Sequence, residues 1–92
     1  MSKLSDKIVL ITGASSGIGL ACAKKFAENG AKLILTARRK ERLKTLADQL
    51  KKSHETECHI VELDVRDQKA VQQTIENLPI AWQAVDVLVN NA

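Results

Sequence analysis

The sequence has no tyrosine, and Phe26 and Trp82 are its only phenylalanine and tryptophan. The hydrophobic core is therefore expected to be aliphatic, and a surface that stacks nucleic-acid bases on aromatic rings is not expected. Cysteine is scarce too, because Cys22 and Cys58 lie far apart and match no metal-binding or redox spacing. Both have apolar neighbours, which predicts buried, reduced structural thiols. No apolar run reaches the roughly 18 residues that a membrane-spanning helix needs.

Charge and composition narrow the class of protein further. Hydrophobic residues make up 45% of the sequence and charged residues 27%, which is typical of a folded soluble domain rather than a disordered chain. The net charge is only +3 and gathers at residues 38–40 and 51–52, too little for a typical nucleic-acid surface. His54 and His59 have no Cys or His partner at ligand spacing, so no metal site is expected.

Length and the first residues bear on domain organisation and location. A chain of 92 residues is enough for one small domain, residues 1–92. Residues 1–6 are too short and too polar for a signal peptide. We therefore expect a single cytoplasmic domain that contacts no membrane.

Apolar periodicity alternates between strand and helix patterns along the chain. Short apolar segments predict four strands, at residues 8–11, 32–37, 58–64 and 85–89. Helical spacing predicts three helices between them: one from about residue 16 to 29, one built on Leu43, Leu46, Ala47 and Leu50, and one that Asp67 caps and Pro79 ends. Strand–helix units of this length predict an α/β fold, the N-terminal part of a Rossmann-type doubly wound parallel sheet with strand order 3-2-1-4.

The same periodicity predicts which side chains form the core. One face of the first helix carries Ile18, Ala21, Cys22 and Phe26, and one face of the third carries Val71, Thr74, Ile75 and Leu78. The core candidates in the third strand are Ile60, Val61 and Leu63. Gly30 is placed to end the first helix in a left-handed conformation, and Trp82 is expected on a helix edge.

Three of the four glycines lie where the first strand turns into the first helix, in Thr12-Gly13-Ala14-Ser15-Ser16-Gly17-Ile18-Gly19. Gly13 has no Cβ, so it allows the chain to turn sharply out of the strand. Gly17 allows a pyrophosphate to approach the main chain, and Gly19 allows the helix to pack tightly on the sheet. The helix N-terminus adds free N–H groups and about half a positive charge. The spacing differs from the usual Gly-x-Gly-x-x-Gly, and an ordinary glycine–serine turn could share it.

This loop resembles the cofactor loop of the short-chain dehydrogenase/reductase family. Asn90-Asn91-Ala92 resembles that family's Asn-Asn-Ala-Gly motif without its final glycine, and Asp64-Val65 resembles its adenine-contacting pair. The resemblance implies that the Asp64 carboxylate accepts from the adenine amino group and that the Val65 N–H reaches a ring nitrogen. It also places residues 90–92 beside the adenosine ribose, with Asn90 contacting the cofactor mainly through its main chain. Alternatively, Asp64 could only cap the next turn, and Asn91 could equally hold the sheet together.

The segment after the second strand bears on the choice of dinucleotide. Ala37 lies where NAD-using relatives usually carry an acid, which would bind the ribose hydroxyls and repel a 2′-phosphate. Arg38 could instead contact a phosphate with two prongs, and Ser15 could add a hydrogen bond. We therefore expect NADP rather than NAD to bind at Gly13, Ser15, Ser16, Gly17, Ile18, Gly19, Arg38, Arg39, Asp64, Val65, Asn90 and Ala92. In the alternative, Arg38 and Arg39 are solvated loop residues.

The resemblance also implies what the chain would do. Family members use a Ser, a Tyr and a Lys downstream of the Asn-Asn-Ala-Gly motif to protonate the developing alkoxide. Because the sequence has no tyrosine, we assign no catalytic residue and expect an incomplete NAD(P)-binding domain of an oxidoreductase. Three parts of the sequence resemble the NADP-dependent 3-hydroxy-acid and L-serine dehydrogenase branch: Arg38-Arg39-x-Glu41-Arg42-Leu43, residues 76–79 with Trp82, and residues 85–92.

A second class of function stays open. The chain could be a non-catalytic nucleotide-binding or interaction module that needs a partner chain. In either case the fourth predicted strand, residues 85–89, lies at a sheet edge with unpaired backbone groups. We therefore expect self-association or aggregation through this strand, and the resemblance implies that full-length relatives commonly form homo-oligomers.

Overall fold

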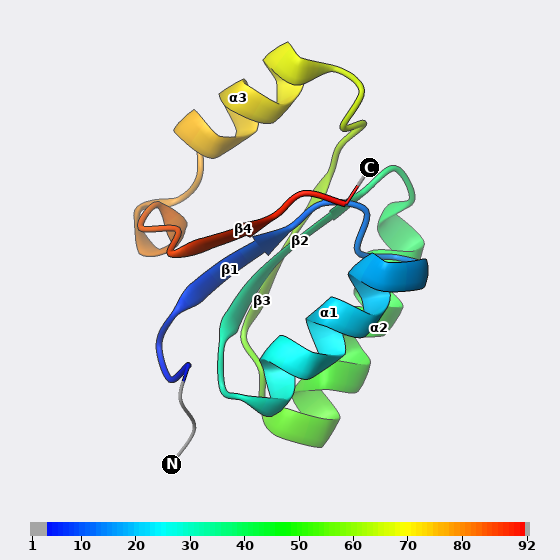
Figure 1. Cartoon of the computed structure of the whole chain (residues 1–92), viewed down its shortest axis with the longest axis vertical. Helices are drawn as coiled ribbons and strands as arrows, with labels where there is room; N and C mark the ends of the chain where they lie inside the picture. Colours follow the sequence, from blue (N-terminus) through cyan, green and yellow to red (C-terminus); the bar gives the residue numbers. More distant parts are fainter. Residues whose placement is uncertain (1–3, 92) are drawn as a thin grey trace.

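A computed structural model describes residues 4–91 and contains one four-stranded sheet with helices packed against it (Figure 1). The elements follow the chain as β1 (Ile8–Ile11), α1 (Gly17–Glu28), β2 (Lys32–Ala37), α2 (Lys40–His54), β3 (Cys58–Glu62), α3 (Gln68–Glu76), a 3-10 turn η1 (Ile80–Trp82) and β4 (Val87–Val89). All strand pairs are parallel and the order is β3-β2-β1-β4. The predicted fold class and strand order are therefore confirmed.

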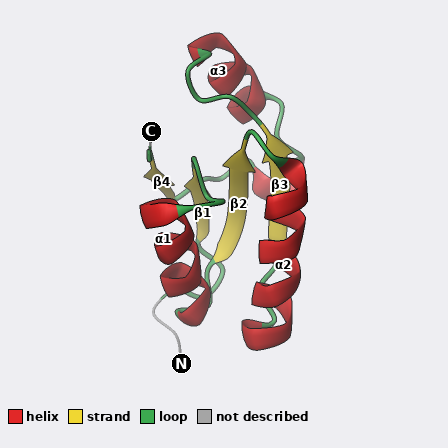
Figure 2. Ribbon diagram, turned by 90° about the vertical axis from the view of Figure 1, so that its right-hand side faces the viewer, coloured by secondary structure: helices red, strands yellow, loops and turns green. Residues whose placement is uncertain are grey.

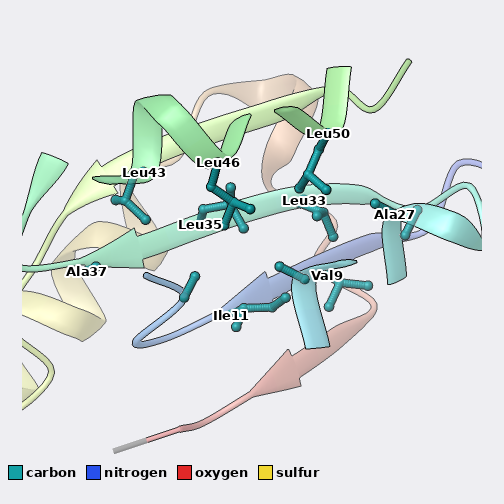
Figure 3. Packing of buried hydrophobic residues seen from close by; sticks show 12 residues of the cluster. Val9, Ile11, Ala27, Leu33, Leu35, Ala37, Leu43, Leu46 and Leu50 are labelled. Carbon is teal, nitrogen blue, oxygen red and sulfur yellow. The ribbon is translucent and has the colours of Figure 1, made fainter. Parts of the chain in front are cut away.

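The two faces of the sheet are covered by different elements. Side chains alternate along each strand, so neighbouring residues point to opposite faces. Val9 and Ile11 of β1 belong to the cluster beneath α1 and α2, together with Leu33 and Leu35 of β2. Figure 3 shows Leu33 and Leu35 of β2 packing beneath Leu46 and Leu50 of α2, which belong to the predicted stripe on that helix, with Val9 and Ile11 on the neighbouring strand. The opposite face carries a smaller cluster built on Ile8, Leu10, Ile34 and Leu78.

The core face of α1 differs from the prediction. Ile18 is 71% exposed and Ala21 is also exposed, whereas Gly19, Ala23 and Ala27 are buried. Small residues spaced four apart let the helix axis lie close to the sheet, so the stripe of closest contact follows glycine and alanine rather than the bulkiest side chains. Cys22 and Phe26 flank that stripe and are only partly buried.

The prediction of which α3 side chains face the core was also only partly right. No residue of α3 itself is buried, and Ile75 is 37% exposed, whereas Leu78 beyond its end is buried against the sheet. Figure 2 shows α3 standing at one end of the sheet, away from α1 and α2. Asp67 caps α3 as predicted, because its carboxylate accepts from the Ala70 N–H at 3.1 Å.

Element ends and connections show further small differences. β3 ends at Glu62 rather than at residue 64. β4 begins at Val87 rather than at residue 85, and just before it the Asp86 carboxylate accepts from the backbone N–H of Ile8 at 2.9 Å. Trp82 does not lie on a helix edge; its ring stacks on His59 of β3, with ring centroids 5.6 Å apart, and packs against the second cluster. Gly30 has φ +83°, the left-handed conformation that was predicted.

Both cysteines are free but only half-buried, so the prediction of buried thiols was only partly right. Burial nevertheless raises the pKa of the Cys58 thiol to about 11, because a thiolate would lose hydration there. Between residues 4 and 91, no helix is long and apolar enough to cross a membrane.

Candidate cofactor-binding site

A cavity of about 430 Å³ opens where the strands of the sheet reach their carboxyl ends. This volume lies within the range of about 300–1,000 Å³ that small-molecule sites occupy. In parallel α/β sheets ligands bind at this edge, because the loops that follow the strands converge there. The lining residues lie at or just after the carboxyl ends of the four strands: Gly13, Ser15, Ser16, Ala37, Arg38, Arg39, Arg42, Leu63, Asp64, Val65, Arg66 and Asn91.

The glycine loop is shaped by close backbone contacts. Gly13 has φ +63°, and a Cβ added there would lie 2.7 Å from the Asn91 carbonyl oxygen. A Cβ on Gly19 would lie 2.2 Å from the Gly13 carbonyl oxygen. The tight packing predicted at Gly19 therefore occurs against the end of β1 and its loop. A Cβ on Gly17 would meet no atom within 4 Å, so the main chain at the start of α1 is open to a close approach from outside.

A hydrogen-bond network joins the glycine loop to the end of β4. The buried Thr12 hydroxyl accepts from the backbone N–H of Asn91 at 2.8 Å. The side-chain nitrogen Nδ2 of Asn91 donates to the Gly13 carbonyl at 3.4 Å. The same hydroxyl lies 3.2 Å from Asn90 Oδ1 and 3.3 Å from the Val89 carbonyl, to either of which it can donate. Asn91 thus does hold two strand ends together, one of the two roles considered for it.

Thr12 was not predicted as a site residue, although it begins the glycine loop. The signal for its role is a hydroxyl at the end of an otherwise apolar strand, since buried polar groups need partners.

Three arginines from the end of β2 and the start of α2 line the cavity. Arg38 and Arg39 follow β2 directly, and Arg42 lies in the first turn of α2, all with exposed side chains. None of the three takes part in an ion pair within residues 4–91. Arg39 is also the N-cap of α2 and makes no side-chain capping bond, so the helix N-terminus adds its positive potential to the same place.

The turn after β3 adds a forked ion pair to the cavity lining. Arg66 Nη2 donates to Asp64 Oδ2 at 2.8 Å and Nε donates to Oδ1 at 3.1 Å. The Arg66 backbone N–H also donates to Oδ1, at 3.0 Å, which makes Asp64 the cap of its own turn as well as a cavity residue. Hydrogen bonds from Arg66 lower the pKa of Asp64 from 3.8 to about 2, with a smaller contribution from the charge of Arg38.

The predicted site residues do not all meet at this cavity. Gly13, Ser15, Ser16, Arg38, Arg39, Asp64 and Val65 line it. Gly17 and Gly19 shape the loop beside it, Ile18 projects to solvent, and Ala92 lies outside the described residues. Asn90 lines a neighbouring open cavity of about 410 Å³, whose lining comes mainly from α3 and which shares Val65 with the first.

Arg42 and Arg66 line the cavity without having been predicted. The sequence offered only weak signals for them: Arg42 lies four residues after Arg38, one helical turn away, and Arg66 lies two residues after Asp64. No group of three or more metal-ligating side chains occurs in the part of the chain that the structure describes.

Comparison with known proteins identifies the family. The short chain dehydrogenase profile matches residues 7–92. Sulfoacetaldehyde reductase 2 of Chromohalobacter salexigens is 56% identical over 97% of this chain and 34% of its own length. The NADP-dependent 3-hydroxy acid dehydrogenase YdfG of Salmonella typhi is 47% identical over 92% of this chain and 33% of its own. This chain therefore spans about a third of the length of these relatives.

Solved structures agree in fold. L-sorbose reductase from Gluconobacter frateurii, complexed with NADPH and L-sorbose, superposes with a TM-score of 0.88 at 40% identity, over 97% of this chain and 34% of that one. Serine dehydrogenase from Escherichia coli superposes with a TM-score of 0.77, also at 40% identity, over 88% and 36%. The family match, the parallel sheet and the glycine loop confirm the predicted resemblance, and the chain belongs to the short-chain dehydrogenase/reductase family.

Proposed function

We propose that this chain binds the adenosine and pyrophosphate portion of NADP at the carboxyl edge of its sheet, within an NADP-dependent oxidoreductase. The observation that carries the proposal is that Arg38, Arg39 and Arg42 line the cavity together with Ala37. Ala37 is buried and has no carboxylate to repel a 2′-phosphate. The relatives whose names specify NADP, and the solved neighbour that holds NADPH, support the same cofactor.

The binding mode follows from the loops around the cavity. The open main chain at Gly17 and the free N–H groups of α1 suit the pyrophosphate. Arg38 suits the 2′-phosphate, because a guanidinium can donate two parallel hydrogen bonds to one phosphate. Asp64 and Val65 suit the adenine edge, and by the family resemblance Asn90 would contact the ribose side of the cofactor. The cofactor, when bound, supplies or accepts the hydride, and the residues of this chain bind and orient the cofactor.

For the whole enzyme we propose a substrate with a hydroxyl or carbonyl group, with 3-hydroxy acids favoured. Names that support this class are the 3-hydroxy acid dehydrogenase and the serine dehydrogenase. The 92 residues contain no tyrosine, so we expect this chain alone to catalyse no NADP reduction. A nicotinamide absorbance assay with serine and 3-hydroxy acids tests this. Steady reduction that survives removal of host enzymes would show the expectation wrong and would also exclude the non-catalytic alternative.

We further propose that the chain associates with itself through β4. This strand lies at one edge of the sheet, and Leu88 in its middle is 55% exposed. Leu88 also lines the second cavity, of about 410 Å³, and so does Ile75 of α3, which is 37% exposed. An exposed apolar edge strand favours pairing with another strand.

Titration calorimetry with NADP and NAD tests the cofactor assignment. We expect the chain to prefer NADP, and Arg38→Ala to weaken NADP by about 1.5–3 kcal/mol, roughly tenfold to a hundredfold, while NAD changes little. Lys51→Ala is the matched control, because it removes an exposed cation from the far end of α2, the helix that follows Arg38. Equal affinities in the unmodified chain, or no selective loss of NADP, would contradict the proposal.

A further inference from the structure

Asparagine precedes glycine once in the sequence, at Asn29-Gly30, in the turn that joins α1 to β2. Figure 1 shows this turn at the end of the sheet where β2 begins, opposite the edge that carries the cofactor cavity. A main-chain nitrogen that follows asparagine can attack the side-chain amide, and glycine hinders that attack least because it has no Cβ. Gly30 is exposed and Asn29 is half-buried, so water reaches the pair. The pair therefore has the chemistry of a modification site.

The backbone around this pair forms a Schellman cap at the end of α1. Gly30 has φ +83°, and its N–H donates to the Ala27 carbonyl at 3.0 Å. The Ala31 N–H donates to the Phe26 carbonyl at 3.2 Å, which is the second bond of that motif. The nitrogen that would attack is therefore engaged in a hydrogen bond while the helix end is closed.

The side chain of Asn29 is held in the same cap. Its Nδ2 donates to the Lys25 carbonyl, one turn earlier, at 2.8 Å, so the nitrogen that would leave is also bonded. The Asn29 carbonyl accepts from the Leu4 N–H at 3.1 Å, and Leu4 packs against the cluster beneath α1 and α2. Both reacting groups of the pair thus have partners, and attack requires these bonds to break first.

We propose that Asn29 is a deamidation site that the cap of α1 keeps closed, so that conversion follows local opening of the last helical turn rather than unfolding of the whole chain. In the open turn the Gly30 nitrogen attacks Asn29 Cγ and a C–N bond forms. The side-chain nitrogen leaves as ammonia, with the proton that the Gly30 nitrogen loses. Water then opens the resulting succinimide ring at either carbonyl, which gives aspartate or isoaspartate.

Either product weakens the cap. An aspartate places a carboxylate oxygen, in place of a donor, against the Lys25 carbonyl, at a helix C-terminus that disfavours negative charge. Isoaspartate adds a methylene to the main chain between residues 29 and 30, so the two Schellman bonds no longer fit the turn. Each conversion therefore leaves a lasting chemical mark that the end of α1 has opened.

Peptide mapping tests the assignment, because Lys25 and Lys32 bound one tryptic peptide, residues 26–32, whose sole asparagine is Asn29. At mildly alkaline pH the folded chain should form aspartate and isoaspartate about a hundredfold more slowly than the chain in urea, since only the opened fraction reacts. Equal rates in buffer and in urea, in a chain whose circular dichroism shows its helices, would overturn the proposal.

Asn77 is the internal reference for the effect of the following residue. Its Nδ2 donates to the Gln73 carbonyl at 2.8 Å, as that of Asn29 does to Lys25, but Leu78 follows it. It should therefore react slowly in urea as well as in buffer. Conversion of Asn77 in urea as fast as that of Asn29 would mean that the following glycine is irrelevant, and would overturn the assignment of the pair.

Two matched substitutions separate local from global opening. Lys24→Gly weakens α1 near its end, and Lys44→Gly makes the same change in α2; both lysines are exposed. Lys24→Gly should speed the conversion of Asn29 roughly three- to fivefold, the change expected from the poor helix propensity of glycine. Lys44→Gly should leave the rate unchanged. Equal acceleration by both would mean that the whole chain unfolds first, and would overturn the role of the cap.

Discussion

Replacing Gly19 by alanine should destabilise the chain although alanine is the better helix former. The added Cβ would lie 2.2 Å from the Gly13 carbonyl oxygen and 2.9 Å from the Asn91 side-chain nitrogen. The first obstacle is backbone, so α1 or the loop would have to move by about 1 Å, and such overpacking typically costs about 1–3 kcal/mol. Helix propensity returns about 1 kcal/mol. With a main-chain obstacle we expect the upper part of the range, a net loss of about 2 kcal/mol.

Urea and thermal unfolding measure this loss. For a domain of this size it corresponds to a fall in Tm of roughly 8–16 °C. Ala21→Gly, at an exposed position of the same helix, is the matched control and should lose only the propensity difference of about 1 kcal/mol. If propensity alone mattered, the two substitutions would have opposite signs. A Gly19→Ala variant as stable as the unmodified chain would refute the reasoning about the close contact at this position.

Four further outcomes follow from the contacts described above. Thr12→Val should cost about 1–3 kcal/mol in urea unfolding, since the Asn91 N–H loses its acceptor; an unchanged midpoint would contradict this. By carbon NMR the Asp64 carboxyl should titrate near pH 2, and in Arg66→Ala near 3.8. Because its folded pKa lies below the unfolded value, the stabilisation by this pair is present above about pH 4 and is lost as the pH falls towards 2. Titration near 3.8 in the unmodified chain would count against the fork. Cys58, with its raised pKa, should react with iodoacetamide near neutral pH more slowly than in urea, and equal rates would mean that burial does not protect it. Leu88→Lys should lower the sedimentation coefficient measured at micromolar concentration, whereas an unmodified chain that stays monomeric on concentration would rule out association through β4.

The sheet could be predicted from the sequence because its two central strands, β1 and β2, are largely continuous apolar runs. Ile8–Ile11 and Lys32–Ala37 are covered on both faces, so their boundaries follow directly from composition. The strand order followed from the connections, since βαβ crossovers have one hand. Prediction was weaker where burial is graded. The stripe on α1 is defined by Gly19, Ala23 and Ala27, and small residues give little hydrophobic signal.

The cavity was predicted only in part, because its walls come from distant segments. The glycine loop and Arg38 could be recognised locally, each from its place after a strand. The contributions of Arg42 and Arg66 depend on the convergence of α2 and the β3–α3 turn at one sheet edge. Spacing along the chain carries almost no information about such convergence.

Amide NMR of the chain during titration with NADP tests the central claim most directly, because it locates the ligand as well as detecting it. We predict saturable shifts confined to residues 13–19, 38–42, 64–66 and 90–91, the loops at the carboxyl edge of the sheet. Leaving out the 2′-phosphate, as in NAD, should remove mainly the shifts at residues 38–42. Shifts at the opposite edge of the sheet, or none at saturating NADP in a folded chain, would contradict the account.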